Sequence, residues 1–106
     1  MSFEYDPEAD SGYLSLSPKR ADITLEIGER IGVDFSKDKK VVGIEIIDAS
    51  SLISEILGRA ISKENVKKVI CKATQSDAIY LDFEYGKHHG RYAIANPYKS
   101  PLLSVA

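Results

Sequence analysis

Three acidic side chains at alternate positions near the start of the chain are the first candidates for chemistry. Asp6, Glu8 and Asp10 recur with the spacing that opens many loops for hard cations such as Ca²⁺. The rest of the segment departs from such a loop, because Pro7 is misplaced and Ser17 stands where a bidentate acid would close the site. We therefore expect no metal here, and a solvated turn in which Asp6 and Asp10 accept backbone N–H bonds.

The two histidines are the second candidates. His88 and His89 are adjacent, lie between two glycines, and form a small basic tip with Lys87 and Arg91. Consecutive strand residues point to opposite faces, so both imidazoles reach one ligand only if the loop curls. As a general acid or base, either would also need a carboxylate within hydrogen-bond reach. An exposed hairpin loop is the favoured interpretation, with partner contact and catalysis as alternatives.

Tyrosine is the dominant aromatic residue, with six copies in the chain. Tyrosines at strand positions usually pack their rings and leave the hydroxyl at the rim, and they also anchor many interfaces. Packing is the first interpretation, and Tyr13 and Tyr80 are kept as candidates for contact with a ligand or partner. Basic residues do not interleave with the rings, which argues against stacking on nucleic acid.

The elements that must position these side chains are mostly strands. Alternating apolar residues and turn residues predict them near residues 3–5, 13–16, 23–27, 31–35, 41–47, 69–71, 78–85 and 91–95. Residues 41–47 are the most hydrophobic of these segments and therefore the best candidate for a central strand. Gly43 within them indicates a bulge or a close approach of another chain segment.

The hydrophobic period changes after residue 48. An apolar stripe of helical spacing follows, formed by Leu52, Ile53, Ile56 and Leu57. Asp48 or Ser50 can cap the start of this helix, and Gly58 is a natural stop. A helix of two to three turns is marginal alone, so it must dock on the sheet.

Together these patterns predict an α+β fold. We expect an antiparallel β-meander of about six to eight strands with one short helix, about residues 49–58, packed on one face. Residues 1–97 should form a single domain and residues 98–106 a C-terminal tail, in which Leu102, Leu103 and Val105 could dock on a partner or subunit.

The composition is that of an ordinary globular chain. At 106 residues and a formal net charge of −2, it has enough length for one core and no overall attraction to nucleic acid or anionic lipid. No apolar run approaches the roughly 18 residues of a membrane span, and the N-terminus lacks the layout of a signal peptide. We expect a cytoplasmic protein without cofactor. The single cysteine, Cys71, should be a small buried hydrophobe.

Two segments of the N-terminal half carry a resemblance. One is the frame of Tyr5, Asp6, Asp10, Tyr13 and Leu16, and the other is the stretch from Val42 to Ser50 with the sequence VGIEIIDAS. In combination, residues 3–52 resemble the uncharacterised family called domain of unknown function 2283. The resemblance implies partner binding or an antitoxin-like role, because members are small and often encoded beside small toxin-like proteins. The second β-rich half, residues 66–96, lies outside it.

These observations favour a non-enzymatic protein-interaction module. We expect it to self-associate as a homodimer, through a strand edge or the Ile53/Leu57 face of the helix, or to bind a small protein partner. The alternative is a small metal-dependent hydrolase or ligand-binding protein that uses the acidic turn and the histidine loop together. A nucleic-acid binder would require the basic residues to meet on one surface, which concerns Lys37, Lys39, Lys40, Lys87 and Arg91.

Overall fold

Two antiparallel sheets and a helix enclose the hydrophobic core of this chain, for which the computed structural model describes residues 2–98. The first half supplies β1 (Ser2–Asp6), β2 (Ser11–Ser15), β3 (Ile23–Ile27), β4 (Ile31–Phe35) and β5 (Val41–Ile47). The second half supplies α1 (Ala49–Leu57), α2 (Lys63–Val66), β6 (Ile70–Gln75), β7 (Ala78–Tyr85) and β8 (His88–Ala95). The predicted α+β class is confirmed, and the single turn α2 adds a second, very short helix.

The five-stranded sheet has the order β1-β2-β5-β4-β3, and the three-stranded sheet has the order β6-β7-β8. Every neighbouring pair is consecutive in the chain except β2 and β5, so both sheets are meander-like. The predicted central strand is confirmed, because β5 lies in the middle of the larger sheet. Its register with β4 shifts between Asp34 and Phe35, which face Gly43 and Val41, so Val42 is the extra residue of a bulge.

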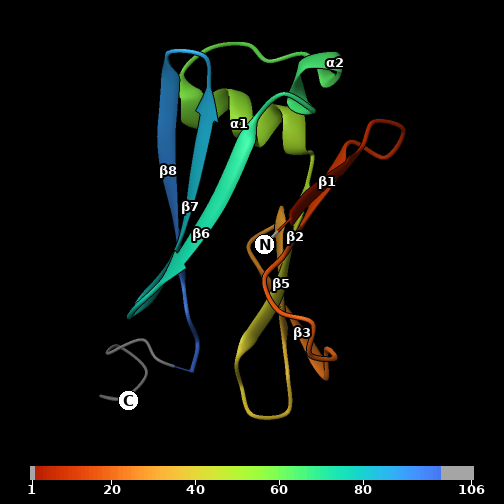
Figure 1. The fold of residues 1–106 in the computed structure, drawn as a ribbon, viewed down its shortest axis with the longest axis vertical. Coiled ribbons are helices and arrows are strands. Elements are labelled where there is room, and N and C mark those ends of the chain that lie inside the picture. Colours follow the sequence, from red (N-terminus) through yellow and green to blue (C-terminus); the bar gives the residue numbers. More distant parts are fainter. Residues whose placement is uncertain (1, 99–106) are drawn as a thin grey trace.

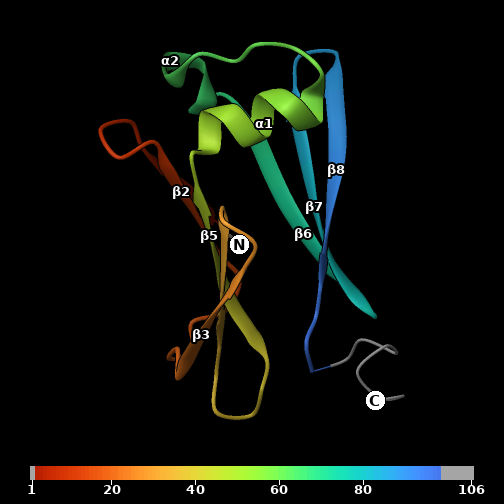
Figure 2. The ribbon, with the colours of Figure 1, turned by 180° about the vertical axis from the view of Figure 1, so that it is seen from behind.

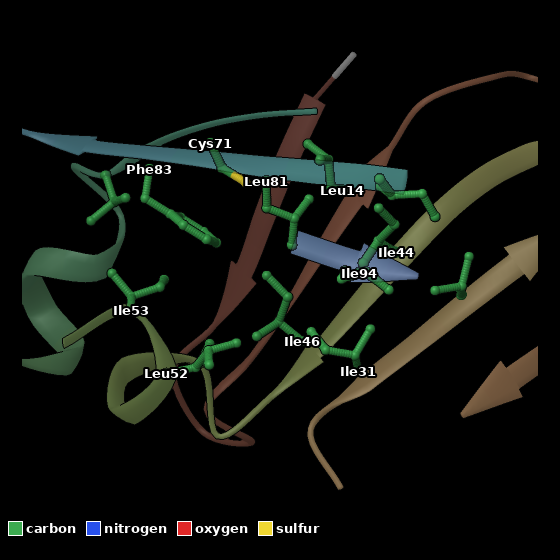
Figure 3. Packing of buried hydrophobic residues seen from close by; sticks show 14 of the residues in the cluster. Leu14, Ile31, Ile44, Ile46, Leu52, Ile53, Cys71, Leu81, Phe83 and Ile94 are labelled. Carbon is green, nitrogen blue, oxygen red and sulfur yellow. The ribbon is translucent and has the colours of Figure 1, made fainter. Parts of the chain in front are cut away.

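The core forms where the inner faces of the two sheets meet α1 (Figure 3). Leu14 and Ile44 come from the larger sheet, Leu81 and Phe83 from β7, and Ile53 from α1, and all are at most 1% exposed. Alternation explains this arrangement, since one face of each strand is apolar. Residues from both halves of the sequence thus join one hydrophobic cluster.

Helix α1 follows the predicted pattern closely. Leu52, Ile53 and Leu57 are buried, and Gly58 ends the helix in the left-handed conformation, with φ at 71° and its N–H bonded to the Ser54 carbonyl. The prediction that the Ile53/Leu57 face could mediate self-association is wrong, because the core covers that face.

The packing of β8 against α1 explains why residue 90 is a glycine. An added Cβ at Gly90 would lie 2.5 Å from the carbonyl oxygen of Ile56. Strand β8 can therefore approach α1 this closely only because residue 90 has no side chain.

Different elements lie at the two ends of the molecule (Figures 1 and 2). Both helices lie at one end of the long axis, together with the β1–β2 and β7–β8 turns, and the β4–β5 hairpin lies at the opposite end. Past β8, the Tyr98 ring packs edge-on against Phe35, with centroids 4.9 Å apart, and the Tyr98 N–H donates to the Asn96 side chain. The remainder of the predicted tail, with Leu102, Leu103 and Val105, lies outside the described residues.

Candidate interaction surface

The acidic turn between β1 and β2 is held by its own side chains. Asp6 Oδ1 accepts the backbone N–H of Glu8 at 3.0 Å and that of Ala9 at 3.5 Å. This is the local turn role predicted for Asp6, and the Glu8 side chain is exposed.

Asp10 makes contacts that sequence reasoning did not foresee. Its Oδ1 accepts the Tyr5 hydroxyl at 2.6 Å and the Ser50 backbone N–H at 3.0 Å, and its Oδ2 accepts the Ser50 hydroxyl at 2.7 Å. Its carbonyl oxygen accepts the Ala49 N–H at 2.9 Å. The N-terminus of α1 is therefore capped from a hairpin 40 residues away in the sequence.

The predicted cap by Asp48 or Ser50 is wrong in its mechanism. Asp48 stands at the capping position, but its backbone is left-handed, with φ at 52°, and its side chain makes no capping bond. An ordinary cap needs an extended backbone there. Ser50 lies inside the helix and not at the capping position, and its hydroxyl donates to Asp10.

These contacts set the ionisation of the pair. Burial, and then the hydrogen bond to Asp10, raise the pKa of Tyr5 well above its usual range. Partial burial alone would raise the pKa of Asp10, but the hydrogen bonds from Tyr5 and Ser50 outweigh it and lower the pKa. Asp10 is thus a carboxylate whose two oxygens are both engaged by hydrogen bonds that join β1, β2 and α1.

The prediction that His88 and His89 stand in a hairpin loop is wrong, because both belong to strand β8, paired with the end of β7. They lie at the other end of the same helix. His88 Nε2 is 3.1 Å from Arg59 Nη1, just past the C-terminus of α1, whereas Asp10 holds the N-terminus. A helix of nine residues separates them by roughly 13 Å. The structure therefore does not bring the acidic turn and the histidines together. Within residues 2–98, no three His, Cys, Asp or Glu side chains gather to hold a metal ion.

Tyr13 lies on the outer face of the larger sheet, where it has a structural partner. Its hydroxyl donates to Asp34 Oδ2 at 2.7 Å, and Thr24 donates to Asp34 Oδ1 at 2.5 Å. Burial, and then the bond to Asp34, raise the pKa of Tyr13 to about 12. The ring crosses Gly43, where an added Cβ would lie only 1.8 Å from the hydroxyl oxygen. The close approach predicted at Gly43 is confirmed, and Tyr13 joins β2 to β4 across β5.

The outward-facing side of the three-stranded sheet, which we call the β6–β8 outer face, gathers most of the other candidates. Here Arg91 binds Asp82, with Nε 2.7 Å from Oδ1, and the Arg91 guanidinium lies 5.0 Å from the centre of the Tyr80 ring. A shallow groove of about 560 Å³ on this face is lined by residues that include Ile70, Lys72, Glu84, Lys87, His89 and Arg91.

Ile70 is the functional candidate that sequence reasoning missed. Its side chain is 51% exposed, the highest value among the exposed large hydrophobic residues of the described chain. In the register it stands opposite Glu84, and Lys72 stands opposite Asp82, so an isoleucine occupies the polar face of the sheet. Its alternation with the buried Cys71 could have revealed this outward position.

Of the nine predicted contact residues, Tyr80, Lys87, His89 and Arg91 share the β6–β8 outer face. The other five lie near the two ends of α1 or on the larger sheet: Asp6, Glu8, Asp10, Tyr13 and His88.

The basic residues also divide between the two ends of the molecule. The β4–β5 hairpin carries Lys37, Lys39 and Lys40 at one end, and the β7–β8 turn with Lys87 lies at the other (Figure 1). The single surface that a nucleic-acid binder would require from these cations is therefore not formed.

Cys71 is buried, as predicted. Burial, with a smaller contribution from Asp82, raises the pKa of its thiol to about 12. The thiol is therefore protonated at neutral pH and poorly nucleophilic. In the described part of the chain, no helix is long and apolar enough to cross a membrane.

Comparison with known proteins places the N-terminal half. The model of a family described as "Protein of unknown function (DUF2283)" matches residues 2–50, which covers β1 to β5 and the first two residues of α1. No curated protein and no solved structure matches the chain. The matched segment contains Tyr5, Asp10 and Ser50, so the resemblance seen in the sequence is confirmed and its residues form the cap of α1. The similarity to DUF2283 thus covers residues 2–50, and the three-stranded sheet lies outside the match.

Proposed function

We propose that this protein is a non-enzymatic protein-interaction module. It self-associates, and it binds a small protein partner through the β6–β8 outer face. The observation that carries the proposal is the position of Ile70, which is 51% exposed at the edge of a sheet and beside a groove. Burying the exposed half of this side chain against a partner contributes roughly 1 kcal/mol.

The side chains around Ile70 suit a protein surface as the ligand. Arginine and tyrosine are the residue types most often found at the energetic centre of interfaces, and Arg91 lies over Tyr80 while Asp82 holds its guanidinium. Lysine, glutamate and histidine line the same groove, so the rim offers charges of both signs. A partner with an apolar side chain flanked by acidic and basic residues would match this pattern.

The wider proposal follows from the sequence. The antitoxin-like role implied by the family resemblance would make the partner a small toxin-like protein. We infer a cytoplasmic protein and one domain over residues 1–97, which is supported by the single hydrophobic cluster drawn from both sheets. No observation favours the alternative hydrolase, since its two proposed loops lie at opposite ends of α1.

The test compares two exposed isoleucines. Tagged protein carrying Ile70→Lys is expressed in the native host beside wild type and an Ile47→Lys control, since Ile47 is 40% exposed on the other sheet. Quantitative proteomics should find a protein that wild type and Ile47→Lys recover equally and that Ile70→Lys loses at least tenfold. Equal recovery of every protein by all three forms would contradict the proposed surface.

A further inference from the structure

Strand β3 is an edge strand with an unusual sequence for that position. It pairs with β4 and ends the strand order of the larger sheet. Its three aliphatic residues stand opposite buried core positions of β4, with Ile23 44% exposed and Leu25 and Ile27 half-buried. Thr24 and Glu26 alternate with them on the outer face.

Each of the other edge strands has a charged residue at its central position or at one of its two central positions. These residues are Glu4 in β1, Lys72 in β6 and Arg91 in β8. Charged side chains are a common device by which proteins prevent the edges of sheets from pairing with another chain. The central residue of β3 is the apolar Leu25, and the one charged residue of the strand, Glu26, lies next to it on the outer face. Of the four edges in the described structure, β3 is the one without a charged residue at its centre.

We propose that a second copy of this chain pairs with β3, antiparallel and about a two-fold axis at Leu25, to join the two larger sheets. This inference rests on the self-association in the proposed function and specifies its interface. In this register Leu25 faces Leu25 of the second copy, and Ile23 faces Ile27 of the second copy. Thr24 faces Glu26 of the second copy on the opposite side of the sheet. The strand is thus complementary to itself, as an isologous interface requires.

Charge selects this register over its neighbours. Side chains keep to their face only if the axis passes through a residue, so the nearest alternatives centre on Thr24 or Glu26. Centring on Thr24 would place Asp22 opposite Glu26, and centring on Glu26 would place that glutamate opposite itself. Like charges directly opposite one another destabilise an antiparallel pair. The Leu25 register is the one of the three that avoids such a contact.

The first test reverses the charge at one position. Thr24→Lys would create two ion pairs with Glu26 across the axis, and Thr24→Glu would create two repulsions, while both lose the same bond to Asp34. By sedimentation equilibrium, the dimer dissociation constant should fall for Thr24→Lys and rise for Thr24→Glu, each by roughly 2- to 30-fold. Thr74 of β6 is the matched control, because it is also an exposed threonine on an edge strand. Its Lys and Glu variants should change the constant less than about twofold.

The second test fixes the register covalently. Leu25→Cys places two thiols opposite each other, where Cα atoms about 4.5–5.5 Å apart permit a disulfide. Glu26→Cys places its thiols two positions apart, with Cα atoms roughly 8 Å from each other, which is too far. Mild oxidation should therefore give a covalent dimer with Leu25→Cys and none with Glu26→Cys.

The outcomes separate this inference from the proposed function. A wild-type dimer that neither Thr24 variant affects and that Leu25→Cys fails to cross-link would overturn the β3 interface and leave self-association standing. A wild-type chain that stays monomeric at all concentrations would overturn both the interface and self-association. Partner binding through Ile70 is decided independently by the proteomic comparison.

Discussion

Replacing the carboxylate of Asp10 should destabilise the whole fold, because this side chain joins the first hairpin to α1. Asp10→Asn is the sharpest change, since asparagine keeps the size of the side chain and tolerates the left-handed backbone, where φ is 50°. It removes the charge, and one acceptor oxygen becomes an NH₂ donor. The variant therefore isolates the three hydrogen bonds that Asp10 accepts from Tyr5 and Ser50.

The magnitude follows from the bond count. A hydrogen bond to a charged group contributes about 1.5–3 kcal/mol and a neutral one about 0.5–1.5 kcal/mol, so the two bonds accepted by Oδ1 lose roughly 1 kcal/mol each. At the other position the NH₂ group cannot accept, so the Ser50 hydroxyl must turn to accept from it. Asp10 is only partly buried, and water compensates part of the loss. We expect the free energy of unfolding to fall by about 1–3 kcal/mol. Asp6→Asn in the same turn is the control and should cost under about 0.5 kcal/mol, because Asp6 is exposed and accepts only local N–H groups.

Urea denaturation measures both variants, and pH adds an independent check. The pKa of Asp10 is lowered in the folded state, so its contribution is present above the unfolded pKa, near 3.9. The contribution is lost as the pH falls through the lower, folded pKa. The difference between wild type and Asp10→Asn should therefore be full at pH 6 and shrink below about pH 4.

A double-mutant cycle with Ser50→Ala should give a coupling energy of about 0.5–3 kcal/mol. The reasoning fails if Asp10→Asn costs no more than Asp6→Asn, or if the coupling energy with Ser50 is near zero.

Three further predictions follow from close packing and burial. Gly43→Ala should cost about 1–3 kcal/mol of unfolding free energy by displacing the Tyr13 ring, and combining it with Tyr13→Ala should cost less than the sum of the two single changes. Gly90→Ala should cost at least as much as Gly43→Ala in the same denaturation assay, because its Cβ would meet the backbone of Ile56 and a backbone moves less readily than a ring. The free energy of unfolding of wild type should fall as pH rises above about 9, because the thiol of Cys71 ionises there in the unfolded state but keeps its proton in the folded state, where its pKa is about 12. Cys71→Ala should flatten the first part of that decline. A variant with the same pH profile as wild type would contradict this prediction.

Much of the fold could be predicted from the periodicity of the hydrophobic residues alone. Alternation located the strands, and the stripe from Leu52 to Leu57 located α1 and its end at Gly58, because each pattern reports a local backbone geometry. The periodicity could not predict that β2 pairs with β5, and this pairing brings the turn at Asp10 beside Ser50. That contact spans 40 residues and depends on the topology of the sheet, so local capping rules assigned the cap to Asp48 or Ser50.

The candidate surface was predicted in the same partial way. Tyr80, Lys87, His89 and Arg91 stood out by residue type, and the three-stranded sheet does place them on one face. His88 separates from His89 because successive strand residues point to opposite faces. Ile70 escaped notice because an isoleucine in a strand is ordinarily buried. Its exposure and its register against Glu84 show that it points outward.

Hydrogen exchange of the wild-type chain tests the central claim, that the protein self-associates through β3, without any substitution. Backbone amides of β3 should exchange more slowly as the protein concentration rises from micromolar to millimolar, while amides of the β1 edge keep a constant rate. Exchange rates in β3 that do not depend on concentration, or protection that develops on β1, would contradict the account.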